Sequence, residues 1–404
     1  MKNSILEKDF EYLLTPVAIR NTTKKIYDLA LSGKTNFSVD ESKIEACSDF
    51  VLEVINKNYP DHNIPFHSRW GHFKVGNIDR EKKFNDLLSD LSPIDRARTK
   101  LDLVITSVLL DAGAGKDWKY LEGENYFNRS EGLAVASYYL FTDKSLSSGN
   151  KLESNAEGLS NLTKEILENA FQVTSSNPLI GVDGRLNLLK SLGRVVGENS
   201  VIFPKKRPGS IIDYLINKHG NEFEVGDILN AVLVGLGPIW PGRIDVNGKN
   251  LGDVWHYAPL GSEISEDTVI CFHKLSQWLT YSLVTPMLEA GLKITGAEKL
   301  TGLSEYRNGG LFLDFGVINL RDEKNKEKSH KPSSDLIIEW RALTLQLLDR
   351  VGVVVQKKLN KSPEDFPLAK VLEGGTWWAG RVIAKKLRES GEPPLQLDSD
   401  GTVF

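Results

Sequence analysis

Apolar residues recur at helical spacing along much of the chain. Residues 92–95 read Ser-Pro-Ile-Asp, which is typical of a helix start with a serine cap, an early proline and an acid in the first turn. The apolar side chains that follow share one helix face: Leu101, Val104, Ile105, Val108 and Leu109. A second stripe predicts a helix over residues 335–359: Leu336, Trp340, Leu343, Leu347 and Val351.

Weaker patterns predict further elements. Helices are expected over residues 155–170, 211–218 and 268–290, the last with a kink at Pro286. Short strands are expected over residues 201–203, 243–246 and 311–318. No repeat or low-complexity linker interrupts the sequence. We therefore predict a mainly α protein with small strands or hairpins, folded as a single compact catalytic domain over residues 1–404.

The composition is that of an ordinary globular protein: 40% hydrophobic and 26% charged residues in 404. A net charge of −4 argues against binding nucleic acid through a broad basic face. Cys47 and Cys271 are far apart, so we expect neither a disulfide scaffold nor a thiolate metal cluster. The N-terminus has no apolar signal core, and no apolar stretch approaches a membrane-spanning length. We expect a cytoplasmic protein.

The first segment with candidate chemistry is residues 64–73, which contain His67, Arg69 and His72 among aromatic residues. The arginine guanidinium can donate two parallel hydrogen bonds to a phosphate, so one interpretation is a pocket wall for a phosphorylated sugar. The other interpretation is a packed turn whose polar groups bond to the backbone. Asp111 follows an apolar run, and we expect burial to raise its pKa. A metal site that uses the two histidines lacks a standard ligand spacing.

Three more motifs permit both structural and functional interpretations. Trp240 lies in a rigid segment rich in glycine and proline, and either stacks on a flat ligand or belongs to the core. Glu131 follows Ser130 at a predicted helix start, where capping by the serine and the helix dipole account for both residues; the functional alternative is a catalytic Glu131. Residues 373–376 read Glu-Gly-Gly-Thr, and a glycine-rich turn before a helix is suited to anion binding. Trp377 follows directly.

The most informative motif places His273, Lys274 and Gln277 within one helical turn. About thirty residues later, Glu305, Tyr306 and Arg307 precede two glycines, which predicts a turn. A carboxylate can activate water or stabilise an oxocarbenium ion, and cations can hold a phosphate. The structural alternative is a solvated lysine together with a surface ion pair between the glutamate and the arginine.

Several of these runs resemble the bacterial and fungal uracil-catabolism family of the URC pathway. The resemblance spans nearly the whole sequence and rests on residues 64–73, 109–115, 129–133, 235–243, 272–283, 300–312, 372–377 and 399–404. It implies a step close to the hydrolysis of a ribosyl- or phosphoribosyl-urea. This chain has Gly71 where many relatives have arginine, and Asn77 where they have glycine.

The order of residues 272–277, 300–301, 305–307 and 311 is also similar to that of the queuosine salvage N-glycosylases. That resemblance implies a helical, DNA-glycosylase-like fold and cleavage of an N-glycosidic bond. The pattern of those enzymes has aspartate at the position of Glu305 and tyrosine at that of His273. The substitution of glutamate for aspartate keeps the carboxylate and extends its reach.

Together, motifs and resemblance favour an N-glycosidase-type hydrolase that acts on a small riboside or ribotide without a metal or another cofactor. Glu305 and Lys274 are the predicted catalytic residues. The predicted substrate-binding residues are His67, Arg69, His72, Asp111, Trp240, His273, Gln277, Tyr306, Arg307 and Trp377. One alternative is a metal-dependent amidohydrolase that uses His67, His72 and Asp111. Another is a non-catalytic partner that passes an intermediate to other enzymes of the pathway.

Overall fold

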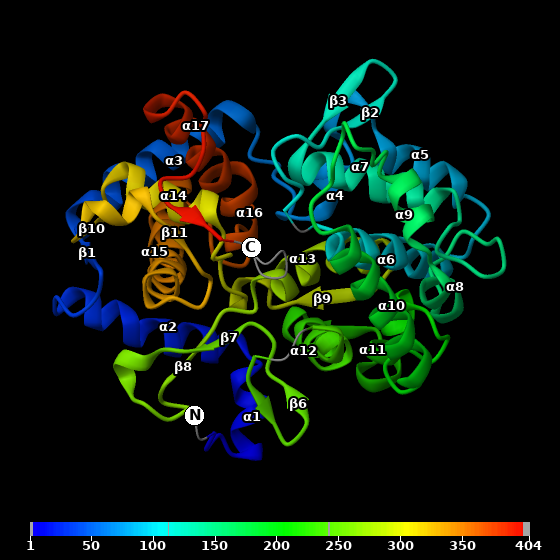
Figure 1. The fold of residues 1–404 in the computed structure, drawn as a ribbon, viewed down its shortest axis with the longest axis horizontal. Coiled ribbons are helices and arrows are strands. Elements are labelled where there is room, and N and C mark those ends of the chain that lie inside the picture. The colour runs from blue at the N-terminus through cyan, green and yellow to red at the C-terminus, as the bar shows by residue number, and fades with distance from the viewer. Residues whose placement is uncertain (1–2, 112, 241–242, 399–404) are drawn as a thin grey trace. The chain divides into compact units, whose positions relative to one another are not determined.

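The computed structural model describes residues 3–111, 113–240 and 243–398. The predicted terminal motif, residues 399–404, lies outside them, as do Ala112, Pro241 and Gly242. Helices dominate and every strand is two or three residues long, so the predicted mainly α class is confirmed (Figure 1). The similarity to DNA glycosylases stays a prediction. The chain divides into two compact units, which are described separately.

The first unit comprises Met1–His67, Gly242–Gln277 and Gly296–Val403. Its α-helices are α1 (Glu7–Leu13), α2 (Pro16–Leu31), α3 (Ile44–Asn58), α14 (Tyr306–Phe315), α15 (Asp335–Leu359), α16 (Leu368–Val371) and α17 (Trp377–Leu387). Its other helical turns are η1 (Glu41–Lys43), η5 (Ala258–Leu260), η6 (Ala297–Lys299), η7 (Glu323–Glu327) and the π-helix η8 (Leu372–Thr376). The core forms around α15, which packs on α2, α3 and α14.

The second unit comprises Ser68–Pro241 and Trp278–Thr295. Its α-helices are α4 (Arg69–His72), α5 (Arg80–Leu87), α6 (Pro93–Leu109), α7 (Arg129–Thr142), α8 (Ala156–Asn161), α9 (Lys164–Ala170), α10 (Val182–Glu198), α11 (Ile211–His219) and α12 (Val225–Leu236). Its short 3-10 turns are η2 (Val75–Asn77), η3 (Pro208–Ser210) and η4 (Gly237–Ile239). Helix α13 (Lys274–Glu289) begins in the first unit and ends in the second.

The strands pair two by two. The antiparallel pairs of the first unit are β1 (Phe37–Val39) with β10 (Ile318–Leu320), β5 (Asp245–Val246) with β6 (Lys249–Asn250), and β7 (Val254–His256) with β8 (Val269–Cys271). The same unit has one parallel pair, β11 (Ser329–His330) with β12 (Gln396–Leu397). In the second unit β2 (Tyr120–Glu122) pairs antiparallel with β3 (Asn125–Phe127), and β4 (Glu222–Glu224) pairs parallel with β9 (Lys293–Thr295).

The helices with clear caps were predicted well. The side chain of Ser92 accepts a hydrogen bond from the Asp95 amide at the start of α6, as expected. Helix α15 has the predicted bounds, and α11 is one residue longer than predicted. The predicted helix over residues 155–170 is in fact α8 and α9, because Thr163 caps a new helix. The strand predicted over residues 201–203 is wrong, since these residues form a turn.

Helix α13 begins later than predicted. Residues 269–271 form β8, and His273 has a φ of 48°, in the left-handed region that a continuous helix excludes. Near the other end of the helix, Pro286 lacks the N–H that would reach the Ser282 carbonyl. The Trp70 indole takes that place and donates to the Ser282 carbonyl at 2.8 Å. Pro286, where a kink was predicted, is therefore accommodated by the Trp70 side chain from α4.

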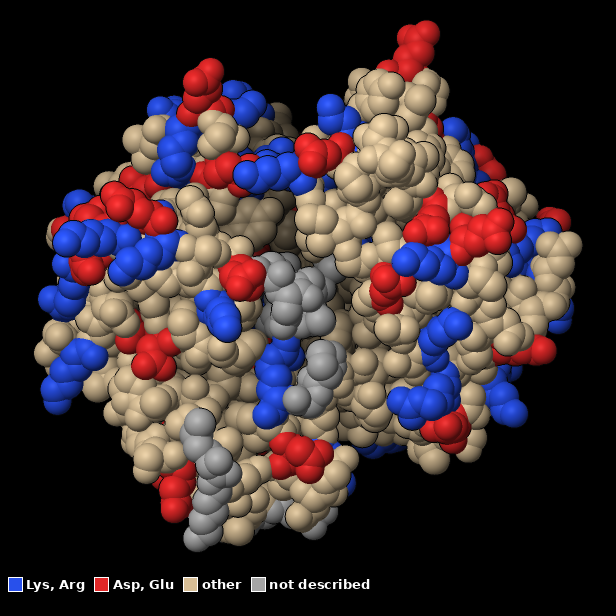
Figure 2. Space-filling view, in the orientation of Figure 1, with Lys and Arg blue, Asp and Glu red and all other residues tan. Residues whose placement is uncertain are grey.

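Charged side chains of both signs alternate over the face shown in Figure 2. This mixing agrees with a net charge of only −4. Among the described residues, no helix combines the length and apolar character that a membrane crossing needs.

Candidate functional site

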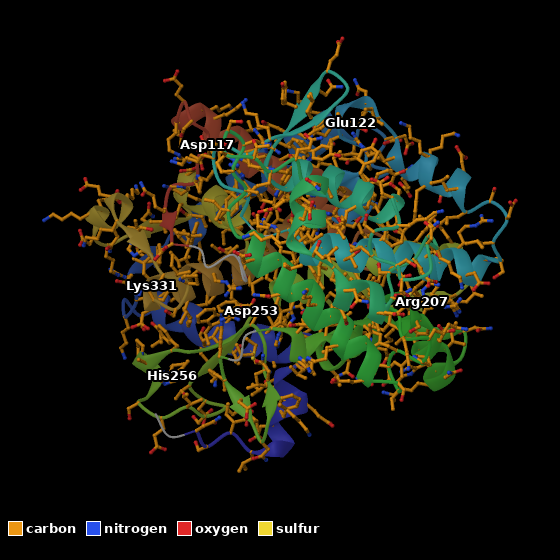
Figure 3. All side chains as sticks on the ribbon, turned by 45° about the vertical axis from the view of Figure 1, so that its right-hand side comes forward. Asp117, Glu122, Arg207, Asp253, His256 and Lys331 are labelled. Atoms are coloured by element: carbon orange, nitrogen blue, oxygen red, sulfur yellow. The ribbon has the colours of Figure 1, made fainter. Side chains whose placement is uncertain are left out.

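The backbone around Lys274 is fixed by Asp253, which is labelled in Figure 3. The Asp253 carboxylate accepts a hydrogen bond from the Lys274 amide at 3.1 Å, at the N-terminus of α13. The Asp253 carbonyl accepts from the Phe272 amide at 3.0 Å. An anion at a helix N-terminus binds unpaired amides and interacts favourably with the helix dipole. Asp253 therefore sets where α13 begins and where the Lys274 side chain leaves the backbone.

Arg341, on α15, holds Asp253 from the other side. Its two terminal nitrogens donate to the Asp253 carboxylate at 2.9 and 2.7 Å, and its Nε donates to Ser304 Oγ at 3.3 Å. Burial acts to raise the pKa of Asp253, but the charge and hydrogen bonds of Arg341 outweigh it and hold the pKa well below its usual range. One buried guanidinium thus connects the start of α13 with the residue before Glu305.

Glu305 caps helix α14. Its carboxylate accepts hydrogen bonds from the Arg307 amide at 2.8 Å and the Asn308 amide at 2.5 Å. Burial raises the pKa of Glu305, while these two amides and the charges of Lys274 and His67 act in the opposite direction. The residue is partly exposed. Glu305 is therefore a rigidly held carboxylate with a raised pKa, subject to the charge of Lys274.

The turn predicted at residues 305–310, and the strand predicted after it, are wrong. Helix α14 occupies residues 306–315 and ends at Gly316, whose φ is 76°. Gly309 serves close packing rather than a turn: a Cβ there would lie 2.7 Å from Trp340 Cε2. The Trp340 indole donates to the Gly309 carbonyl at 3.0 Å.

His67 pairs with Glu373 in the same unit. The distance from His67 Nδ1 to Glu373 Oε2 is 2.7 Å, and the Tyr59 hydroxyl donates to Glu373 Oε1 at 3.3 Å. The His67 ring lies 5.9 Å from that of Trp377. Glu373 is in the π-helix η8, a type of irregularity that is frequent at functional sites.

The glycines after Glu373 do not form the predicted anion-binding turn. Gly374 and Gly375 lie inside η8, between α16 and α17, so no helix N-terminus is exposed there. A Cβ at Gly374 would lie 2.6 Å from Ile64 Cδ1, and one at Gly375 would lie 2.6 Å from Val51 Cγ1. These glycines let the π-helix pack closely on its neighbours.

Other predicted residues of the first unit mainly bond within the protein. His273 is buried, and its Nε2 donates to the Leu13 carbonyl at 2.8 Å. The Gln277 amide donates to Thr301 Oγ1 at 2.5 Å and accepts from the Thr301 amide at 3.0 Å. Arg307 is also buried and donates to the Gly391 carbonyl at 2.8 Å. These bonds favour positioning roles. Tyr306 is partly exposed beside the Arg307 guanidinium.

In the second unit, Arg69, His72 and Asp111 come together around Ser130. Arg69 Nη1 donates to Asp111 Oδ1 at 2.8 Å and lies 3.3 Å from His72 Nδ1. The Ser130 hydroxyl lies 2.7 and 2.8 Å from the two Asp111 oxygens. Arg69 is fully buried, and its Nε donates to Ser107 Oγ at 2.7 Å. These three predicted substrate-binding residues thus belong to one hydrogen-bonded network.

This network changes two expectations. Burial acts to raise the pKa of Asp111, but the charges of Arg69 and His72, with hydrogen bonds from Ser130 and Arg69, lower it below its usual value. The expected rise is wrong. The Ser130 side chain does not cap α7 either; the helix begins at Arg129 and the hydroxyl faces Asp111.

The other predictions in this unit concern Trp240, Asn77 and a metal. Trp240 is partly exposed at the end of η4. Asn77 has a φ of 58°, which asparagine and glycine tolerate, so the difference from its relatives is sterically accommodated. Within the described part of the chain, no three His, Cys, Asp or Glu side chains gather in a way that could hold a metal ion.

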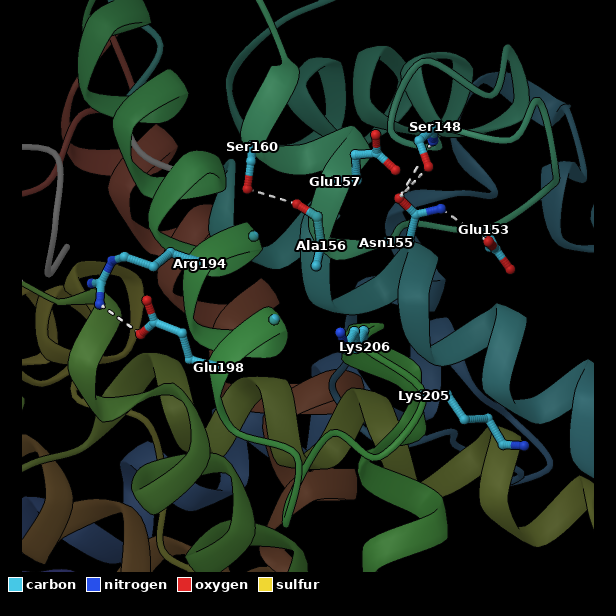
Figure 4. Close-up of a pocket in the computed structure, with 12 residues that line it drawn as sticks. Ser148, Glu153, Asn155, Ala156, Glu157, Ser160, Arg194, Glu198, Lys205 and Lys206 are labelled. Carbon is cyan, nitrogen blue, oxygen red and sulfur yellow. Dashed lines mark hydrogen bonds and ion pairs between the residues drawn. The ribbon is translucent and has the colours of Figure 1, made fainter.

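A groove of about 620 Å³ also lies in the second unit, between α8, α10 and residues 205–206. Figure 4 shows that its polar side chains bond to one another: Arg194 pairs with Glu198 at 3.4 Å, and Asn155 bonds Glu153 at 3.0 Å. Nearby, Arg207 pairs with Asp102 and Glu153. Nothing in this arrangement singles out a reacting group.

Three residues that hold predicted site residues in place were not among the predicted ones: Asp253, Arg341 and Glu373. Arg341 carried no clear signal, because helical spacing places it away from the apolar stripe of residues 336–351, on a side of the helix where a charge is ordinarily solvated. The structure buries that side of α15 as well, so the guanidinium needs a partner. The partner, Asp253, is 88 residues away along the chain, and no local pattern connects the two.

Known proteins resemble this chain along nearly its whole length. A family described as protein of unknown function, DUF1688, matches residues 12–404. Uracil catabolism protein 4 of Lachancea kluyveri is 39% identical over 99% of this chain and 100% of its own length. Protein urg3 of Schizosaccharomyces pombe is 40% identical, over 97% of this chain and 98% of its own length. With a family match and two relatives that extend across almost all of its residues, the chain belongs to the DUF1688 family.

Proposed function

We propose that this protein is a cytoplasmic hydrolase of uracil catabolism. In our proposal it cleaves the N-glycosidic bond of a ribosyl- or phosphoribosyl-urea and releases urea. The name of the Lachancea relative supports the pathway, and the full-length similarity supports a shared role. Since the family match runs through both units, we treat the 404-residue chain as one catalytic domain that acts on a small molecule.

The observation that carries this proposal is the state of Glu305. A carboxylate that is rigidly held, partly exposed and raised in pKa is a better base than an ordinary surface glutamate. The charge of Lys274 acts on it, which supports a common role for the two predicted catalytic residues. Both sit on backbone that Arg341 connects through Asp253 and Ser304.

In the proposed reaction, the bond between the anomeric carbon and the urea nitrogen breaks, and its electron pair leaves with the nitrogen. The sugar becomes an oxocarbenium ion, which the negative charge of Glu305 stabilises. A water molecule then adds to the anomeric carbon and transfers its proton to Glu305, which passes a proton to the urea nitrogen and becomes a carboxylate again. One water is consumed, and one sugar and one urea are formed.

The other residues of the first unit would bind and orient the substrate. Lys274 supplies a cation for sugar or phosphate oxygens. The hydrogen bond that His67 Nδ1–H donates to Glu373 fixes the orientation of the imidazole ring. Trp377 and Tyr306, both partly exposed, offer aromatic faces that can pack against a sugar ring.

The test is to incubate purified protein with ribosylurea and, separately, with its 5′-phosphate, and to measure the urea released. We expect release from at least one of the two, unchanged by a chelator. Release only in the absence of the chelator would favour a metal-dependent amidohydrolase. No release from either riboside would favour a non-catalytic partner of other pathway enzymes.

A further inference from the structure

The second unit contains a smaller pocket, of about 280 Å³, that none of the predicted site residues lines. One wall is a single face of α6 that includes Arg96 and Lys100. The others are Asn85 from α5 and the last turns of α13, with Pro286 and Glu289. At a liquid volume of about 30 Å³ per water, the pocket has room for roughly nine water-sized groups.

Two buried polar atoms of the lining residues have no hydrogen-bond partner among the described residues: Asn85 Oδ1 and Arg96 Nε. The Arg96 guanidinium is otherwise held by Nη2, which donates to the Ser89 carbonyl at 3.2 Å. Leaving a buried polar atom unpaired costs about 1–3 kcal/mol, and more for a charged group. A bound molecule with polar atoms would remove this cost at both residues.

Lys100 adds further bonding capacity. It is only 2% exposed, pairs with Glu289, and lies with its Nζ 5.6 Å from the Trp70 ring centroid. An ammonium group has three N–H donors. Glu289 Oε2 is its one acceptor within the described part of the chain. Lys100 can therefore donate to a ligand without losing Glu289.

The charges of the lining residues favour a ligand of one sign. Arg96 and Lys100 are positive and Glu289 is negative, so the lining has one excess positive charge. An anion balances this excess and accepts from both cations, which makes short, strong hydrogen bonds. Asn85 can join them, because a rotation of its amide by 180° turns the nitrogen toward an anion.

We infer that this pocket is a binding site for a small monoanion, with a carboxylate held by Arg96 and Lys100. A carboxylate has two oxygens in one plane, which match two donors on neighbouring turns of α6. Pro93, Ala97 and Pro286 supply apolar surface for a short carbon chain. The inference rests on the second unit alone and does not depend on the proposed reaction.

The test is the midpoint of thermal unfolding as a function of sodium acetate, with sodium chloride keeping the ionic strength constant. A ligand that binds the folded state stabilises it by RT ln(1 + [L]/Kd), so the dependence of the midpoint on acetate concentration gives the Kd. We expect such a rise for the wild type. Arg96→Gln should raise the Kd for acetate by about tenfold, the scale of one charge-assisted hydrogen bond. Glu289→Gln should lower the Kd by roughly threefold, because it removes a negative charge that repels the bound anion.

The opposite signs of these two effects separate binding from a loss of structure. Arg194→Gln is the matched control, since Arg194 is on α10 and pairs with Glu198 outside this pocket. It should leave the Kd for acetate unchanged. The inference is overturned if acetate and chloride act alike, or if Arg96→Gln behaves like Arg194→Gln.

Discussion

Arg341 on α15 donates two hydrogen bonds to the Asp253 carboxylate, of 2.9 and 2.7 Å. Asp253 in turn receives the Lys274 amide, and Arg341 also reaches Ser304 beside Glu305. The guanidinium lies 3.9 Å from the centroid of the Phe272 ring. The ion pair between Arg341 and Asp253 therefore fixes the backbone at Lys274 and next to Glu305, the two predicted catalytic residues.

The first prediction concerns this pair. Arg341→Met should destabilise the protein by about 3–5 kcal/mol, because it leaves the Asp253 charge buried without compensation. In an Asp253→Asn background the same substitution should cost clearly less, since no charge is then left unpaired. Urea unfolding of the wild type, both single variants and the double variant measures the difference. An equal loss of unfolding free energy in the two backgrounds would show that Arg341 does not stabilise the protein through its charge pair with Asp253.

The second prediction concerns the proline of α13. Trp70→Phe should cost about 1–3 kcal/mol, because it removes the indole donor of the Ser282 carbonyl. Pro286→Ala restores a backbone N–H that can reach the same carbonyl. In the Pro286→Ala background, Trp70→Phe should therefore cost less. The cycle is measured by chemical unfolding, and strict additivity of the two substitutions would contradict this role of Trp70.

The third prediction compares two helical glycines. Gly309→Ala should destabilise by about 1–3 kcal/mol, because its Cβ would overlap Trp340 in a packed core. Gly226, in α12, has no atom within 4 Å of its would-be Cβ. Gly226→Ala should instead stabilise by about 0.5–1 kcal/mol through helix propensity. Thermal unfolding of both variants checks the two signs, and a stabilised Gly309→Ala would show that Trp340 is not tightly packed there.

Local sequence patterns gave the fold class and the helices with strong caps. Ser92 and Pro93 mark the start of α6, and a single apolar stripe marks α15, because these signals act within a few residues. A local apolar pattern also led to the wrong prediction of a strand over residues 311–318. There an apolar run resembles a strand, but the capping carboxylate of Glu305 makes it a helix.

The candidate site was only partly predictable, for a physical reason. Glu305 and Lys274 were proposed as catalytic residues because their chemistry stands out in their own segments. The residues that fix them, Asp253 and Arg341, interact across 88 positions of the chain. Gln277 shows the converse: a polar side chain that looked available for a ligand is bonded to Thr301 in the fold.

The fourth prediction uses the charge of Lys274. This charge lowers the pKa of Glu305, against the rise that burial causes. Lys274→Met removes it, so the pKa of Glu305 should rise further, and a base with a higher pKa becomes protonated at a higher pH. The acid limb of the kcat/KM profile should therefore move to higher pH. Lys274→Arg, which keeps the charge, should leave the acid limb in place. An acid limb that does not move in Lys274→Met would show that the charge of Lys274 does not act on the group that titrates.

The most direct test of the proposed function is the turnover of Glu305→Gln on the riboside that the wild type cleaves. Glutamine keeps the size of the side chain and an oxygen that can still cap α14, so the variant should fold and bind the substrate. Glu305→Asp, which retains the carboxylate, should be the milder change. We predict that urea release by Glu305→Gln falls by roughly a hundredfold or more, the scale for loss of a positioned acid-base group. Release near the wild-type rate would contradict the account and leave Glu305 as the cap of α14.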